Sequence, residues 1–132
     1  MARTIELADG VYRIATDNYR LNTGLVLGLE RALVVDTGAG PRQATEIYDE
    51  VRRLTRLPIT VVNTHGHYER FFGNDVFAAM GVEEFWAHPR AARAIRKYGA
   101  AQRSYVETLE PEMAHHQGAA TDIVVPNHLV AN

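Results

Sequence analysis

Two histidines and a glutamate lie close together in the segment VVNTHGHYERFFGN, residues 61–74. His65 and His67 follow an apolar, strand-like run and are separated by one glycine, which leaves room and backbone freedom between them. If this segment stays extended, both imidazoles point to the same side and can reach one ion. Imidazole nitrogens suit Zn²⁺, Fe²⁺ or Mn²⁺, and Glu69 can supply a third ligand or orient a bound water. The segment is therefore compatible with a metal site that activates water for hydrolysis, although two histidines alone are too few ligands for catalytic zinc.

Two features of this segment favour other interpretations. A His-x-His pattern is short, and taken alone it is more typical of polar loop residues that hydrogen-bond the backbone. Arg70 cannot be a metal ligand, because its guanidinium stays protonated. It can instead hold a carboxylate or phosphate through two hydrogen bonds, or pair with Glu69 or Asp75. We therefore interpret Arg70 as a candidate substrate-binding residue.

Composition limits the possible functions. The chain has 132 residues, of which 46% are hydrophobic and 23% charged, as is typical of one soluble globular domain. A net charge of −2 gives no global attraction to nucleic acid or to an anionic membrane. The sequence has no cysteine, so disulfides, thiolate nucleophiles and Cys-bound metals are excluded. Without an apolar signal-like segment or a membrane-length apolar run, we expect a cytoplasmic protein formed by a single domain over residues 1–132.

Strand-like runs alternate with helix-like stretches along the chain, which predicts an α/β layer. Strands are expected on both sides of Asp9-Gly10, over 22–30, 32–35, 59–65 and 83–88, and at both ends of 122–130. Helices are expected from Pro41 to a stop at Pro58, over 71–81, and from Pro89 with a break at Gly99. Residues 110–121 are interpreted as a loop.

Three of these segments together resemble the metallo-β-lactamase superfamily. The run NTHGHYERFFGN resembles a strand that ends in Thr-His-x-His-x-Asp-His, LVVDTGAG resembles a strand that ends in an Asp-x-Gly turn, and FWAHPRA resembles a later strand with an alanine–histidine step. The resemblance extends from about Asp9 to Val125 and covers the family's N-terminal half only. It implies an α/β fold with a single αβ layer, equivalent to half of the family's αββα sandwich, with a mixed sheet and helices on one face.

The resemblance also implies roles for individual residues. His65 and His67 match two ligands of the first metal, and Glu69 matches the Asp that binds the second metal and positions the attacking water. Arg70 matches the His that binds the second metal, so a dinuclear site is not expected. The implied site is therefore mononuclear, with His65, His67 and Glu69 as metal ligands, Glu69 as the catalytic residue, and zinc, iron or manganese as the ion. A site that binds no metal is the alternative.

Two further residues are expected to support this site. Asp36 matches a strand-end aspartate that holds the metal loops in place. His88 follows a strand and precedes a proline, so it can cap a helix or line the mouth of the site. Other histidines, His115, His116 and His128, occupy no family ligand position and are interpreted as surface loop residues.

Nothing in the sequence matches the family's later ligands, a third His, a bridging Asp and a final His. One face of the predicted sheet would then lack its usual cover. We expect a homodimer, or a second chain, to cover that face.

Two functions remain open. One is a mononuclear hydrolase that is completed by dimerisation and acts on a small-molecule ester, thioester, lactone, lactam or phosphoester. The other is an inactive domain that serves as a binding or assembly module.

Overall fold

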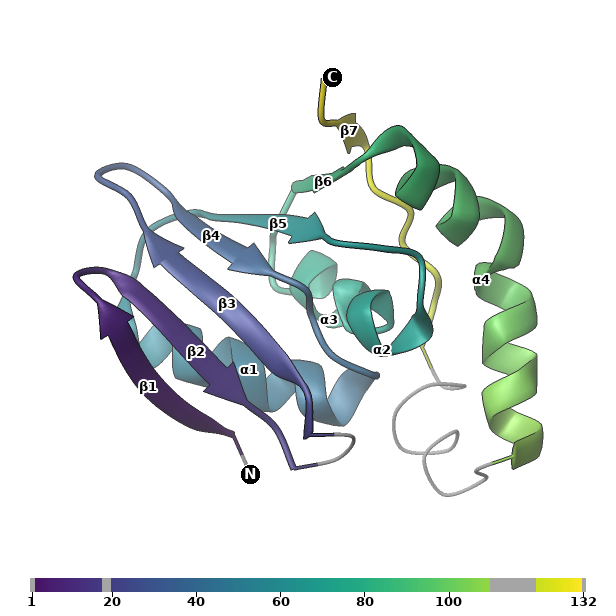
Figure 1. The fold of residues 1–132 in the computed structure, drawn as a ribbon, viewed down its shortest axis with the longest axis horizontal. Coiled ribbons are helices and arrows are strands. Elements are labelled where there is room, and N and C mark those ends of the chain that lie inside the picture. Colours follow the sequence, from purple (N-terminus) through teal and green to yellow (C-terminus); the bar gives the residue numbers. More distant parts are fainter. Residues whose placement is uncertain (1, 18–19, 110–120, 132) are drawn as a thin grey trace.

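The computed structural model describes residues 2–17, 20–109 and 121–131, which form one seven-stranded sheet and four helices (Figure 1). The strands are β1 (Arg3–Ala8), β2 (Val11–Ala15), β3 (Asn22–Leu27), β4 (Ala32–Val35), β5 (Ile59–Asn63), β6 (Glu84–Ala87) and β7 (His128–Leu129). The helices are α1 (Pro41–Leu54), α2 (Tyr68–Phe71), α3 (Asn74–Ala79) and α4 (Pro89–Leu109). None of these described helices is long and apolar enough to span a bilayer.

The strands lie in the sheet in the same order as in the sequence. Strands β1 to β4 pair antiparallel, and β4 to β7 pair parallel, so the predicted mixed sheet is confirmed. The turn between β1 and β2 contains Gly10 at φ 72°, a conformation that glycine adopts without strain. The parallel half needs crossover connections, and α1, the α2–α3 pair and α4 supply them.

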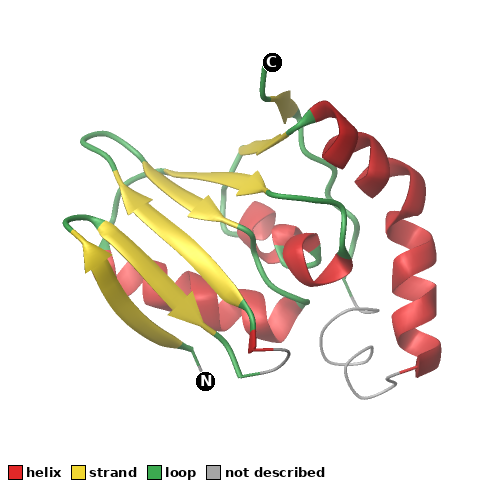
Figure 2. Ribbon diagram, in the orientation of Figure 1, coloured by secondary structure: helices red, strands yellow, loops and turns green. Residues whose placement is uncertain are grey.

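Helices α1 and α3 cover one face of the sheet and lie behind the strands in Figures 1 and 2. Residues at three- and four-residue spacing give α1 one apolar stripe. This stripe packs on alternate residues of the central strands and on Phe77 of α3. The core members with no exposed surface are Ile14, Leu25, Ala32, Val34, Ala44, Val51, Val61 and Phe77. The fold is thus the single αβ layer, with helices on one face, that the sequence predicted.

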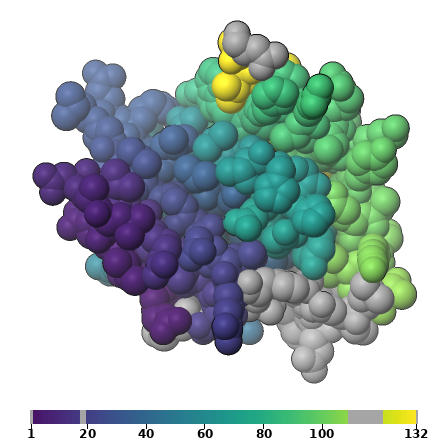
Figure 3. Space-filling model, in the orientation of Figure 1, coloured from purple at the N-terminus to yellow at the C-terminus, as the bar shows by residue number. Residues whose placement is uncertain are grey.

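The other face of the sheet carries no described helix over β1 to β4, which lie at the front in Figure 1, and the side chains of this part of the chain form the purple and blue surface in Figure 3. Apolar side chains lie exposed there, with Ile5 at 47%, Leu7 at 62% and Val26 at 38% of their full accessibility. Leaving such a surface in water is unfavourable, because burying apolar area is the main favourable contribution to association. Cover by a second copy or by another chain stays a prediction.

Two details of the helices differ from the sequence predictions. The helix expected over 71–81 is the shorter α3 (Asn74–Ala79), and the chain forms another short helix, α2 (Tyr68–Phe71), that was not predicted. Gly73 lies between them, where a Cβ atom would lie 2.0 Å from the Thr37 carbonyl oxygen. The break expected at Gly99 is absent, and α4 continues through it. Gly99 instead lets the helix approach Ile123, since a Cβ atom there would lie 2.7 Å from a methyl of that residue.

The ends of the parallel strands also differ from the predictions. Only His128–Leu129 forms a strand within the expected 122–130 region, and the segment before it is not part of the sheet. Strand β5 ends at Asn63, so the histidine segment beyond it is a loop rather than a continuation of the strand. Most of the predicted 110–121 loop lies outside the described residues.

Candidate metal centre

The loop between β5 and α2 carries both histidines of the predicted metal site. It bends at His65 and Gly66 and becomes extended again at His67, which directly precedes α2. Gly66 has no unusual backbone angle; a Cβ atom there would lie 2.7 Å from the Cβ of Ala94, so the glycine allows the loop to pack closely against α4. The extended geometry assumed from the sequence is therefore wrong, and tertiary packing sets the shape of the loop.

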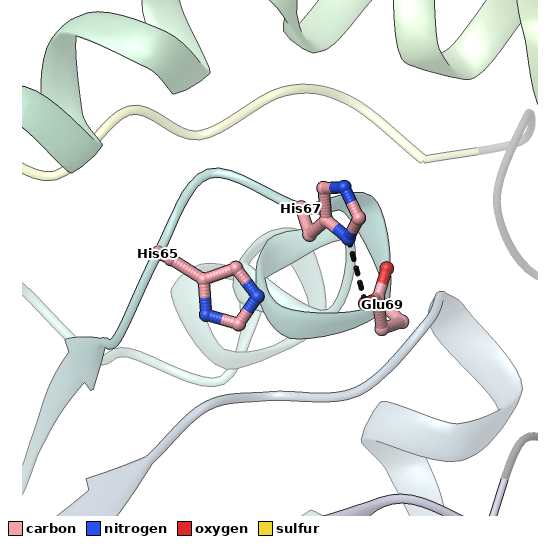
Figure 4. A group of neighbouring side chains, drawn as sticks. All are labelled: His65, His67 and Glu69. Carbon is pink, nitrogen blue, oxygen red and sulfur yellow. Dashed lines mark hydrogen bonds and ion pairs between the residues drawn. The ribbon is translucent and has the colours of Figure 1, made fainter.

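The bend nevertheless brings the predicted ligands together. His65, His67 and Glu69 each offer a ligand atom, and these atoms all lie within 4.8 Å of one another. The two imidazole rings have centroids 5.6 Å apart, and Glu69 Oε1 lies 3.0 Å from His67 Nδ1. Figure 4 shows the three side chains pointing toward one another, with both histidines exposed and the glutamate partly buried.

This set of donors suits a first-row divalent ion. Two imidazoles and one carboxylate are the ligand types of mononuclear catalytic zinc sites, which leave a fourth position for water. Ligand atoms around tetrahedral zinc lie about 3.3 Å apart, since each bond is roughly 2.0–2.1 Å long. The observed spacing of up to 4.8 Å is closed by small rotations of these exposed or partly exposed side chains. The residues present therefore fit one metal ion.

Asp36 and Thr64 determine which nitrogen of His65 is available. The Thr64 hydroxyl donates to Asp36 Oδ2 over 2.7 Å and also lies 3.0 Å from His65 Nδ1. A hydroxyl has a single hydrogen, so it must accept its second hydrogen bond from a protonated Nδ1. The Nε2 atom of His65 then carries the free lone pair, which is the form that can bind a metal.

Asp36 lies at the end of β4 and is only 4% exposed. Its backbone has φ 66°, and its Oδ1 accepts a hydrogen bond of 2.8 Å from the Thr64 backbone N–H. Burial raises the pKa of the Asp36 carboxyl above its usual value, against the opposing effects of the Thr64 hydrogen bonds and of the charges on Arg70 and His65. These contacts join the end of β4 to the histidine loop, and the role of Asp36 in supporting a metal site stays a prediction.

Arg70 turns toward Asp36 rather than toward Glu69 or Asp75. Its Nη1 lies 3.7 Å from Asp36 Oδ2 and donates to the Asn22 carbonyl oxygen over 3.5 Å. The Nε atom of Arg70 is buried and has no hydrogen-bond partner among the described residues. The guanidinium therefore places a positive charge beside the buried carboxylate, in the place that the family resemblance gives to a second-metal ligand.

A network of buried polar side chains behind the loop was not predicted from the sequence. Asn63 and Asn74 exchange two hydrogen bonds of 2.7 and 3.1 Å between their carboxamides. Thr37 donates to Asn74 Oδ1 over 2.8 Å, and Asn74 donates to the Val124 carbonyl oxygen over 3.1 Å. Asn63 also donates to the Arg70 carbonyl oxygen over 3.1 Å. One feature of the sequence could have indicated this network: Asn63 ends a mostly apolar strand. A carboxamide buried there needs hydrogen-bond partners.

The remaining histidines play other parts in the described structure. His88 stands before α4, and its Nδ1 accepts a hydrogen bond of 3.1 Å from the Arg90 backbone N–H, which is a helix-capping contact. Its role in supporting the metal site stays a prediction. His128 stacks on Trp86 with ring centroids 4.8 Å apart. His115 and His116 lie outside the described residues.

Comparison with known proteins agrees with this geometry. Residues 19–126 match the family model described as the metallo-beta-lactamase superfamily. The fold is similar to the solved structure of TMB-1, with a TM-score of 0.60 and 17% identity over 74% of this chain and 48% of that one. It is equally similar to the crystal structure of the DIM-1 metallo-beta-lactamase, with a TM-score of 0.61 and 15% identity over 73% of this chain and 46% of that one. The chain thus spans about half the length of these structures, and it belongs to the metallo-β-lactamase superfamily.

Proposed function

We propose that this chain is a mononuclear metal-dependent hydrolase domain. The observation that carries the proposal is the convergence of ligand atoms from His65, His67 and Glu69 within 4.8 Å. Zinc is the ion that these ligands suit best, and iron or manganese would suit the same set. When bound, such an ion lowers the pKa of a coordinated water so that hydroxide is available near neutral pH.

Glu69 has two tasks in this proposal. One carboxylate oxygen would complete the ligand set, and the other would be placed to act as a general base toward a water molecule. Its contact of 3.0 Å with His67 Nδ1 holds the carboxylate at the loop, and only 17% of its side chain is exposed.

Arg70 takes the place of a second cation. Its side chain is 28% exposed, so part of the guanidinium can reach a ligand while Nη1 remains near Asp36. A fixed positive charge at this position binds a carboxylate or phosphate group of the substrate, or stabilises negative charge that develops during attack. The expected substrate is an ester, thioester, lactone, lactam or phosphoester, and an anionic group near its scissile bond would strengthen binding through Arg70.

A second function is favoured by a specific departure from the family pattern. Arg70, which cannot bind a metal, stands where the resemblance predicts a ligand. A domain with this departure would keep the scaffold, hold no metal and act as a binding or assembly module. Metal content separates the two functions directly.

The test is the number of metal ions per chain, measured by elemental mass spectrometry after zinc supplementation and removal of unbound metal. We expect a ratio near one for the natural chain and near zero for His65→Ala, because two of the three protein ligands cannot retain the ion. His128→Ala is the matched control, since it removes a histidine outside the triad and should keep the ratio near one. A ratio near zero in the natural chain would contradict the hydrolase and favour the binding module.

A further inference from the structure

A pocket of about 720 Å³ lies beside the candidate metal centre, between the histidine loop and α4. Gly66, His67 and Tyr68 form one side. The other side comes from α4 and includes Tyr98, Gln102 and Tyr105. His67 is thus shared between the pocket and the metal triad, so a molecule in the pocket lies directly next to that triad.

Specific contacts hold the two walls of the pocket together. The Gln102 Nε2 atom donates to the Gly66 carbonyl oxygen over 2.8 Å, which ties the helix to the loop. Residues 98, 102 and 105 recur at helical spacing and so share one face of α4. The close approach of Gly66 to Ala94 fixes the loop against the same helix. The pocket is therefore part of the packed fold and keeps its position relative to His67.

The lining determines what the pocket can bind. Among the described lining residues, none is Asp, Glu, Lys or Arg, whereas three are tyrosines. Tyr98 and Tyr105 are 51% and 56% exposed, so their rings are available to a ligand. Aromatic rings favour stacked or edge-to-face contact with other flat rings. A volume of about 720 Å³ lies within the range of small-molecule sites, roughly 300–1,000 Å³.

A second pocket is an alternative ligand site. It measures about 400 Å³ and is lined by Arg3, Arg13 and Arg20 at the beginning of the sheet. None of the triad residues lines it. Its basic lining suits anions in general, but no contact connects it to a ligand atom of the triad. The tyrosine-lined pocket has that connection through His67.

We infer that the tyrosine-lined pocket binds an aromatic group of the substrate and thereby directs the scissile bond to the His67 side of the metal centre. The inference rests on the proposed hydrolase function and narrows its substrate class to esters, thioesters, lactones, lactams or phosphoesters that carry a small aryl or arylalkyl group. Tyr98 and Tyr105 are specificity-determining residues in this view, because they contact the part of the substrate that does not react.

The first experiment measures binding without turnover. The full chain is titrated with 2-naphthol, a neutral aromatic probe, and followed by ¹H–¹⁵N NMR with and without one equivalent of zinc. We expect amide shifts at residues 66–68 and 98–106 in both states. Tyr98→Ala should weaken binding about threefold to tenfold, and Tyr98→Phe should not, because the ring supplies the contact. Leu29→Ala, a change at a fully exposed side chain, is the control and should bind as the natural chain does.

The second experiment compares turnover of phenyl acetate with that of ethyl acetate. Tyr98→Ala should lower kcat/KM for phenyl acetate about threefold to tenfold and leave ethyl acetate unchanged. Equal effects on both esters, or 2-naphthol shifts outside the pocket, would overturn the aromatic site even if the chain is a hydrolase. Naphthol binding at the pocket without zinc uptake or hydrolysis would instead overturn the proposed function and, with it, the assignment of the pocket to a substrate.

Discussion

The helix-covered core and the polar side chains Asp36 and Asn63 at the carboxyl ends of β4 and β5 are both buried, but different interactions hold them. Leu25, Val61 and Phe77 are fully buried in the core, where they touch other apolar side chains. Asp36 and Asn63 are 4% and 1% exposed at the strand ends, where hydrogen bonds occupy them. One region is held by non-directional burial and the other by directional contacts.

Because of this difference, the core mainly stabilises the fold, whereas the strand ends mainly orient side chains. Apolar packing contributes most of the free energy of folding, but it fixes the position of a surface side chain only loosely. Hydrogen bonds contribute less net free energy each, yet they fix which atom faces which. We therefore expect core substitutions to lower stability without altering the metal loop, and substitutions at the strand ends to alter the loop with smaller losses of stability. Three substitutions test this separation.

Phe77→Ala should give the largest effect. Phe77 has no exposed surface and meets the Tyr48 ring edge-on, with centroids 5.5 Å apart. Its removal leaves a cavity and should lower the free energy of unfolding by about 3–5 kcal/mol, measured by urea denaturation. Met80→Ala, at a side chain that is 54% exposed, should change stability by less than about 0.5 kcal/mol. Similar losses in both variants would break the distinction between core and surface.

Asn74→Ala should have an intermediate effect. The substitution removes the carboxamide that joins Thr37, Asn63 and the Val124 carbonyl oxygen. Because more than one buried polar group then loses its partner, we expect a loss of about 2–3 kcal/mol in urea denaturation. Amide hydrogen exchange should also become faster at residues 36–38 and 63–74. Asn22→Ala, at an exposed asparagine, is the control, and an equal loss there would show that the network does not hold the loops.

Thr64→Val should have the smallest effect on stability and a selective effect on the site. It keeps the side-chain shape but removes the hydroxyl between Asp36 and His65. We expect zinc affinity to fall about tenfold, since the tautomer and orientation of His65 are no longer fixed. In metal-free protein, the imidazole ¹⁵N shifts of His65 should move toward a mixture of tautomers.

Thr45→Val is the matched control for this substitution, because Thr45 is exposed on α1 and bonds only its own helix. It should leave both zinc affinity and the His65 signals unchanged. Unchanged His65 signals in Thr64→Val would contradict the role given to the hydroxyl. Loss of stability as large as that of Phe77→Ala would show that the two regions are not separable.

The sequence by itself determined the alternation of strands and helices and the apolar faces that build the core. Apolar runs, turn residues and three-to-four-residue spacing are local signals, so they predicted the strands and the stripe of α1. Local spacing also indicated His65, His67 and Glu69 as a metal group, since all three lie within five residues.

Only the tertiary structure decided which distant groups hydrogen-bond to and pack against these residues. Thr64 connects to Asp36 across 28 positions, and Gln102 reaches Gly66 across 36. The approach of Gly66 to α4 likewise depends on packing between segments that are far apart in the chain. A sequence pattern reports which face of an element is buried, but not which distant group meets a given atom. Side-chain hydrogen bonds depend on which distant group lies next to a given atom. The orientation of the site residues and the shape of the pocket beside them are therefore set only in the folded chain.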